Sequence, residues 1–326
     1  MGRHVAGNCP ELDRLVDDAC AEIGREVSAL AIPRLAGVVL GGGYGRGEGG
    51  VREEGRGKRE EGRGSAECRL SNDLDFFAIT EEGAPEAETL VAIGEALKPV
   101  AEKWTKRLEV DVDFAVKTPW RLKHDEERIM VQELVHGYCD VCGAKGETLF
   151  RNIERRAPSA FPWMEAARLM MNRGMGLLFS LEQHRTRDFV NRNINKCILG
   201  AGDARLVARG AYAWKAGERA AVLGDAFYSA AVEWKFRPKA EPVCDWEKAR
   251  ECWLEAQAEI SRTSGTSRTS RTLRNAARWV ARRRSIGDFR TFGRDPVVRV
   301  LEKVEKRVRE RRAPDSALLR DWQVFN

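Results

Sequence analysis

The chain has 326 residues, 43% of them apolar, with 9 Trp, 12 Phe and a formal net charge of +6, so it can fill the cores of two ordinary domains and is expected to be globular. Its longest apolar stretches fall well short of the roughly 18 residues of a membrane span, and its first twenty residues hold four acids and no long apolar run, unlike a signal peptide. This composition excludes a membrane-spanning protein, and with eight cysteines in no regular framework it predicts a cytoplasmic protein with reduced thiols and no membrane partner.

The predicted elements begin with a helix over residues 12–30. Its apolar residues fall at positions 12, 15, 16, 19, 23, 27 and 30, which is helical spacing, and Pro33 ends it. The run Val38-Val39-Leu40 then predicts a short buried strand. This strand leads directly into the segment 41–50, which has seven glycines in ten residues.

The segment 41–50, called the glycine turn below, predicts close contact between the backbone and a phosphate group. Because few side chains block the approach, its backbone N–H groups can surround a triphosphate. Taken alone, such a loop is weak evidence. It has neither the Gly-Lys-Ser/Thr ending of a Walker loop nor the distant acidic partner of a dinucleotide fingerprint.

Residues 52–68 form a low-complexity insertion after the glycine turn. The sequence Arg-Glu-Glu-Gly-Arg-Gly occurs at 52–57 and again at 59–64, with almost no apolar residue between Val51 and Leu70. We expect a disordered loop here.

Two alternating segments predict strands that carry carboxylates. In the first, Asp73 and Asp75 share one face, about 6.6–6.8 Å apart along the chain, where they could offer oxygen ligands to Mg²⁺. The alternative is that both acids cap turns or lie at a solvated edge. After a predicted helix over residues 90–104, the second segment, 108–114, places Glu109, Asp111 and Asp113 on one face of another apolar strand.

The second half of the chain predicts helices alone. Helical periodicity covers residues 163–182, 203–223, 226–234, 246–260 and 297–311, the last with Asp295-Pro296 as its cap and first turn. A Ser/Arg/Thr-rich connector occupies residues 261–272. Residues 262–312 hold 17 Lys or Arg against 5 Asp or Glu, which suits either a polyanion or a solvated helical surface, and we favour the surface.

One further group has metal-ligand spacing: His136, Cys139 and Cys142. Because no second pair of cysteines lies at a suitable distance, cysteines buried near a strand or turn are favoured over a zinc site.

Taken together, the glycine turn and the acids resemble the nucleotidyltransferase superfamily that includes DNA polymerase β and the kanamycin nucleotidyltransferases. The family pattern is a strand ending in Gly-Gly or Gly-Ser, a short spacer, Asp-x-Asp or Asp-x-Glu on the next strand, and a third acid on a later strand. In small bacterial members the first motif resembles Gly-Ser-x-Ala-Arg-Gly and is followed by Ser-Asp-x-Asp. Here Gly42 to Gly47 and Asn72 to Asp75 stand in the same order, and deleting residues 52–68 leaves 12 residues between Gly43 and Asp73, within the usual spacing.

The resemblance implies an α+β fold. A nucleotidyltransferase domain with a polymerase β-like palm, a mixed sheet with helices, would occupy residues 1–150, and an all-α helical bundle would occupy 151–326. The implied metal ligands and catalytic residues are Asp73, Asp75 and Asp113, with Asp111 as the alternative third acid. The implied nucleotide-binding residues are Gly42, Gly43, Tyr44, Gly45 and Arg46.

Two positions in the first motif need comment. Gly43 replaces the commoner Ser, which removes a hydroxyl contact to phosphate but keeps the backbone contacts. Arg46 would neutralise charge on the leaving pyrophosphate, or it would pair structurally with Glu48 or Asp75.

The implied activity is transfer of a nucleoside monophosphate from a nucleoside triphosphate to a hydroxyl of a small molecule, sugar or protein. Mg²⁺, or alternatively Mn²⁺, would serve as cofactor in a two-metal mechanism that releases pyrophosphate. Terminal nucleotide addition to RNA is one alternative, with residues 262–312 as the electrostatic footprint. Another is a non-catalytic nucleotide-binding or antitoxin-like protein, although such a protein has no reason to keep a costly acidic cluster.

Overall fold

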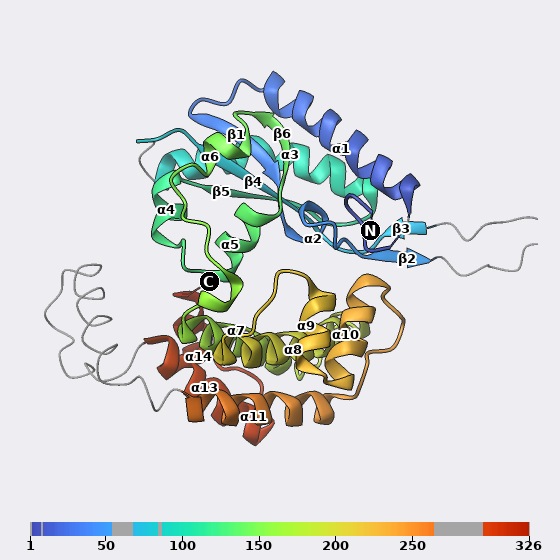
Figure 1. The fold of residues 1–326 in the computed structure, drawn as a ribbon, viewed down its shortest axis with the longest axis vertical. Helices are drawn as coiled ribbons and strands as arrows, with labels where there is room; N and C mark the ends of the chain where they lie inside the picture. Colours follow the sequence, from blue (N-terminus) through green and yellow to red (C-terminus); the bar gives the residue numbers. More distant parts are fainter. Residues whose placement is uncertain (1, 8, 54–67, 84–86, 264–295, 326) are drawn as a thin grey trace, which may run out of the picture. The chain divides into compact units, whose positions relative to one another are not determined.

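Residues 2–7, 9–53, 68–83, 87–263 and 296–325 are described by a computed structural model of the chain (Figure 1). The chain divides into two compact units, the first made of Met1–Ala157 and Lys235–Lys239, the second of Pro158–Trp234 and Ala240–Asn326. All the described strands lie in the first unit, and the elements described in the second are helical. The α+β class predicted from the sequence is thereby confirmed.

The first unit continues to Ala157, whereas the sequence analysis divided the chain after residue 150. Phe150 and Ile153 are still buried in a core cluster of the first unit. The segment up to Ala157 therefore belongs with the sheet. Tertiary burial places this boundary, and no local composition change marks it.

The first unit opens with a helix, a buried strand and the glycine turn, in the predicted order. Helix α1 (Pro10–Ala29) begins with a proline and carries Glu11 and Asp13 in its first turn, where a fixed φ and negative charge favour helix initiation. It ends before Pro33. Strand β1 (Leu35–Leu40) then runs into the short helix α2 (Gly42–Gly45), which is part of the glycine turn.

The main sheet has the strand order β5-β4-β1-β6. Strand β4 (Leu74–Thr80) pairs antiparallel with β1 and parallel with β5 (Val112–Lys117), while β6 (Cys139–Gly143) pairs antiparallel with β1. Parallel neighbours need a crossover, which helix α3 (Ala87–Leu108) supplies. As a result, the beginnings of β4 and β5 lie at the same edge of the sheet as the end of β1.

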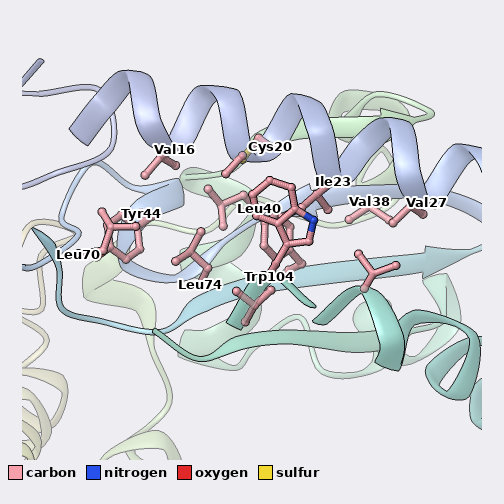
Figure 2. Close-up of a cluster of buried hydrophobic side chains, with 14 of the residues drawn as sticks. Val16, Cys20, Ile23, Val27, Val38, Leu40, Tyr44, Leu70, Leu74 and Trp104 are labelled. Atoms are coloured by element: carbon pink, nitrogen blue, oxygen red, sulfur yellow. The ribbon is translucent and has the colours of Figure 1, made fainter. Parts of the chain in front are cut away.

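Helices cover both faces of this sheet. On one face, α1 and α3 enclose a buried apolar cluster that includes Leu40, Leu74 and Trp104 (Figure 2). On the other, α4 (Pro119–His124), α5 (Ile129–His136) and α6 (Gly146–Leu149) enclose a second cluster with Phe77 and Ile79 of β4. Side chains alternate along a strand, so Asp75 points to the same side as Phe77 and Ile79, away from α1 and α3.

The second predicted strand starts later than expected, and the prediction for Glu109 is wrong. Helix α3 continues through Leu108, stabilised by the burial of Trp104 and by basic residues in its last turn, and β5 begins only at Val112. Glu109 stands between helix and strand with a φ of 57°, and its carboxylate pairs with Arg69. It therefore does not share a strand face with Asp111 and Asp113.

The low-complexity insertion begins and ends as a paired ribbon. Strands β2 (Val51–Glu53) and β3 (Cys68–Leu70) are antiparallel, with Arg52 opposite Arg69 and Glu53 opposite Cys68. Residues 52, 53 and 68 are thus strand, contrary to the prediction of a loop. The rest of the insertion, 54–67, lies outside the described residues.

The second unit is a bundle of helices. Its elements are the 3-10 helix η1 (Pro158–Ala160) and the helices α7 (Trp163–Phe179), α8 (Arg187–Arg209), α9 (Ala216–Leu223), α10 (Ala226–Phe236, whose last two residues belong to the first unit), α11 (Trp246–Thr263), α13 (Pro296–Glu310) and α14 (Ser316–Gln323). Helix α7 packs against α8 and α13, and α8 packs against α11. Met170, Met171 and Met175 of α7 are fully buried and form part of the core of this bundle.

One helix prediction and one connector prediction in the second unit need correction. The helix predicted over 203–223 is wrong, because Gly210 adopts a φ of 66° at the end of α8 and α9 starts only at Ala216. The predicted connector 261–272 begins inside α11, and its remainder lies outside the described residues, as does the cap residue Asp295. Helix α13 starts at Pro296, as expected. None of the helices within the described ranges is both long and apolar enough to cross a bilayer.

Candidate active site

Two carboxylates lie side by side at one edge of the main sheet. Asp75 on β4 and Asp113 on β5 are register partners in the parallel pair, so their side chains leave the same face of neighbouring strands. Both residues are close to the beginning of their strands, where β1 ends and the glycine turn starts. The structure thus brings Asp75, Asp113 and the glycine turn together, as the sequence predicted.

Asp73 and Asp111 flank this pair from the residues just before β4 and β5. The backbones are still joined there, because Leu74 N donates to Asp111 O at 2.8 Å. The pKa of Asp113 is raised above its ordinary value, first by burial and then by the negative charges of Asp111 and Asp73. The ionised carboxylates therefore repel one another across the site, and a bound cation would relieve that repulsion.

The carboxylate of Asp75 packs directly against Gly42. Gly42 has a φ of 60°, and a Cβ at this position would lie 2.2 Å from Asp75 Oδ2. In addition, Gly41 N donates to Asp75 O at 2.8 Å. Glycine is required at position 42 on two grounds, since any other residue would pay about 1–2 kcal/mol for the left-handed backbone and would displace the carboxylate.

Most backbone amides of the glycine turn are already engaged. The amides of Gly45, Arg46, Gly47, Glu48 and Gly49 all donate to backbone carbonyls, at distances of 2.8 to 3.4 Å. Gly42 and Gly43, in contrast, open the first turn of α2, where a helix has no internal acceptor for its amides. The amides best placed to meet a phosphate are therefore those of Gly42 and Gly43, two of the five predicted nucleotide-binding residues.

Tyr44 is a structural part of the turn and has no exposed surface. Its ring lies in the core under α1 (Figure 2). Its hydroxyl donates to Gly50 O at 2.9 Å and accepts the amides of Ser71 and Asn72 at 3.2 and 3.4 Å. The hydroxyl therefore links the end of the turn to the residues that lead into Asp73. Burial raises its pKa to about 12, so it stays protonated and able to donate.

Arg46 is held by acidic side chains of the first unit. Its guanidinium lies 3.2 Å from Glu133 and 3.8 Å from Glu48, and Glu48 is also 3.8 Å from Lys235 Nζ. Glu48 is completely buried, a position that a carboxylate occupies only with positive partners. The structure thus gives Arg46 the first of the two structural partners that the sequence suggested.

The acids fit a divalent cation in ligand type without forming a closed cage. Carboxylate oxygens are the ligands that Mg²⁺ and Mn²⁺ prefer, and the mutual repulsion at Asp113 marks an excess of negative charge. Across the described residues, no three His, Cys, Asp or Glu side chains are gathered closely enough to hold an ion. Mg²⁺ commonly binds through one or two carboxylates together with waters and substrate phosphates, so an open arrangement suits it.

The predicted alternative of a zinc site at residues 136–142 receives no support from the geometry. His136 Nδ1 lies 2.8 Å from Gln132 O. Cys139 and Cys142 are both on β6 and pack, partly buried, against the core cluster beneath α1. This is the placement that the favoured interpretation, cysteines near a strand, expected.

Sequence reasoning missed His4, which touches the glycine turn from the N-terminal segment. The His4 side chain is only 1% exposed, and Nδ1 lies 3.2 Å from Tyr44 O. No periodicity or motif surrounds it. A histidine followed by an apolar residue four positions from the start of the chain carries no signal that could have identified this contact.

Comparison with protein families and with curated proteins gives no match for this chain. A functional conclusion therefore depends on the residues and the geometry described above.

Proposed function

We propose that this protein is a metal-dependent nucleotidyltransferase that moves a nucleoside monophosphate from a nucleoside triphosphate to a hydroxyl acceptor. The observation that carries the proposal is the pairing of Asp75 with Asp113 in register on parallel strands, with the Asp75 carboxylate against Gly42. Three features separated in sequence meet at one sheet edge: a glycine turn, an Asp-x-Asp segment and a later acid. Their chain order is the one that the family resemblance requires.

The glycine turn would bind the triphosphate through backbone amides. Those of Gly42 and Gly43 begin α2 and lie next to Asp75, so a phosphate bound there would also lie beside the acidic edge. Glycine at these positions lets the backbone approach the phosphate oxygens without a side chain between them. Arg46, paired with Glu48 and Glu133, would stabilise the turn and would contribute less to the pyrophosphate.

The acids would hold the cation that such a triphosphate needs. Asp73, Asp75 and Asp113 are the ligands we propose, with Asp113 preferred to Asp111 because it lies within β5 opposite Asp75. When bound, Mg²⁺ neutralises phosphate charge and increases the acidity of an acceptor hydroxyl. The acceptor oxygen would then form a bond to the α-phosphorus as the bond to pyrophosphate breaks.

The test is to incubate the purified protein with each labelled triphosphate, Mg²⁺ and a cell extract, and to identify the species that acquires label. Asp73→Asn and Asp75→Asn should abolish transfer while leaving the fold intact, since each removes a ligand and relieves repulsion. The matched control is Asp18→Asn, which neutralises an exposed acid of α1. Transfer by Asp73→Asn at the wild-type rate would show that the assignment is wrong.

A parallel comparison distinguishes the two candidates for the third ligand. If Asp113 is the ligand, Asp113→Asn should eliminate transfer and Asp111→Asn should reduce it only modestly through the local field. The opposite order of effects would assign the third position to Asp111.

RNA as acceptor has no specific observation in its favour. In the described part of the basic segment, cations of α13 and its C-terminal neighbours are matched by acids of the same region: Lys303 with Asp321, Arg307 with Asp315, and Arg309 with Glu305. Such pairs suit a solvated helical surface. Residues 264–295, which hold much of the positive charge, lie outside the described residues.

A further inference from the structure

A short N-terminal segment, residues 2–7, runs beside the glycine turn and is hydrogen-bonded to it. Gly49 N donates to His4 O at 2.9 Å, and Ala6 N donates to Gly49 O at 2.8 Å. Val5, which has no exposed surface, forms a parallel bridge with Gly49. The segment therefore adds a strand-like edge to the far end of the turn.

The same segment is fixed to α1 through one carboxylate. Asp13 accepts hydrogen bonds from the amides of Arg3, His4 and Val5, at 2.9, 2.7 and 3.1 Å. Although burial favours the neutral acid, these bonds and the His4 charge hold the pKa of Asp13 below its usual range. Three amides directed at one ionised carboxylate give the segment a defined position against the first turn of the helix.

His4 connects this anchored segment to the centre of the glycine turn. Its Nε2 lies 2.9 Å from Asp17 Oδ1, and its Nδ1 lies 3.2 Å from the carbonyl of Tyr44. An ionised Asp17 and the Tyr44 carbonyl can only accept hydrogen bonds, so both contacts are made when both ring nitrogens donate. A ring with two N–H groups is an imidazolium, which means that His4 is positively charged in this arrangement.

The groups that face His4 suit an imidazolium. Asp17 and Asp13 face it from α1, and Cys139 Sγ lies 3.9 Å from Nδ1 on the side of β6. The opposing influences are burial and Arg3, which is 2.8 Å from Asp17. Burial alone would lower the pKa of His4, but Cys139, Asp17 and the Tyr44 carbonyl raise it to about 9.

We propose that His4 is a positioning residue for the glycine turn: as an imidazolium it ties the Tyr44 carbonyl to Asp17 and so holds the amides of Gly42 and Gly43 in place for phosphate. The Tyr44 carbonyl also accepts the amide of Gly47 at 3.4 Å, so it lies at the point where the two halves of the turn meet. This role in phosphate binding rests on the function proposed above. The geometric role, an ordered turn, does not.

The experiment compares His4→Gln with wild type in two measurements. The first is hydrogen–deuterium exchange of peptides covering residues 41–50, without nucleotide and at a single pH. The second is calorimetric titration with magnesium tripolyphosphate between pH 7 and pH 10. Loss of one charged hydrogen bond predicts about tenfold faster exchange in the turn and about tenfold weaker binding at pH 7.

The pH profile separates positioning from a general loss of structure. Wild-type affinity should fall as the pH rises through about 9, and the His4→Gln variant should show no such step. The matched control is His184→Gln, which alters a histidine that is 72% exposed in the second unit and should behave as wild type. If His4→Gln does not fold, Asp17→Asn, which removes the negative charge beside Nε2 but keeps an acceptor oxygen and the ring, should show the same changes in weaker form.

The outcomes for the two proposals are distinct. If wild type binds no tripolyphosphate while His4→Gln still accelerates exchange in the turn, the proposed function fails and the positioning role stands. Equal exchange in wild type, His4→Gln and Asp17→Asn would refute the positioning role, whatever the binding result.

Discussion

The hydroxyl of Tyr44 offers a sharp test of how the candidate site is held together. Tyr44→Phe keeps the buried ring and removes only the oxygen that joins the glycine turn to the residues before Asp73. In wild type this oxygen donates to Gly50 O and accepts from the amides of Ser71 and Asn72. Bulk water does not reach the position that this oxygen leaves, because the tyrosine has no exposed surface.

The free-energy cost of Tyr44→Phe depends on which groups lose a hydrogen-bond partner. Ser71 N and Gly50 O also bond to each other at 3.2 Å, so neither is left alone. The Asn72 amide loses its acceptor and Gly50 O loses its better donor. One lost hydrogen bond and one poorly satisfied amide give a cost of about 2 kcal/mol, or about thirtyfold in a local opening equilibrium.

Hydrogen–deuterium exchange of peptides from β1 and β4 measures this cost locally. A global unfolding curve is less suitable, because the two units of the chain need not unfold together. Transfer activity should fall about tenfold or more, since Asp73 loses its fixed position. Tyr138→Phe is the control. The half-buried Tyr138 ring stacks edge-on against Phe150 at 5.1 Å, and the substitution keeps this contact. Loss of the Tyr138 hydroxyl should therefore cost less than about 0.5 kcal/mol. Unchanged exchange at the beginning of β4 in Tyr44→Phe would show that this hydroxyl does not hold the segment before Asp73.

Three further predictions concern charge and backbone at the same edge. Asp113→Asn should raise the melting temperature at pH 7 but not at pH 3. The pKa of Asp113 is raised by burial and by nearby acids such as Asp73, so the carboxylate destabilises the fold only when it is ionised. In the same melts, Mg²⁺ should stabilise wild type and not this variant. Gly42→Ala should abolish transfer and cost at least about 1–2 kcal/mol in denaturant unfolding, because its Cβ would strike the Asp75 carboxylate; wild-type transfer by this variant would exclude the proposed geometry. Stability contributed by His4 should be complete below pH 6.5 and be lost as the pH rises through about 9, by up to about 3 kcal/mol; unfolding curves of wild type and His4→Gln that keep a constant separation from pH 6.5 to pH 10 would contradict it.

Local patterns were sufficient for the elements that lead into the site. The sequence predicted helix α1, the buried strand β1 and the glycine turn in the correct order. Helical spacing, a short apolar run and glycine content are all properties of neighbouring residues. The strand carrying Asp75 was also evident from its alternation.

Tertiary structure decided which of the acids and turn residues meet. Glu109, Asp111 and Asp113 are equivalent by alternation, but only Asp113 lies within β5 opposite Asp75, because the packing of α3 sets where that strand begins. Tyr44 was likewise predicted to contact nucleotide, but its ring is buried in the core.

A glycine turn followed by acids on strands is predictable from the sequence, since each of these features depends on consecutive residues. Three contacts become evident only in the folded chain: the parallel register of β4 and β5, the burial of the Glu48 carboxylate beside Arg46, and the approach of His4 to the turn. These contacts join residues far apart in the chain, and their formation depends on how helices and sheet bury apolar surface together.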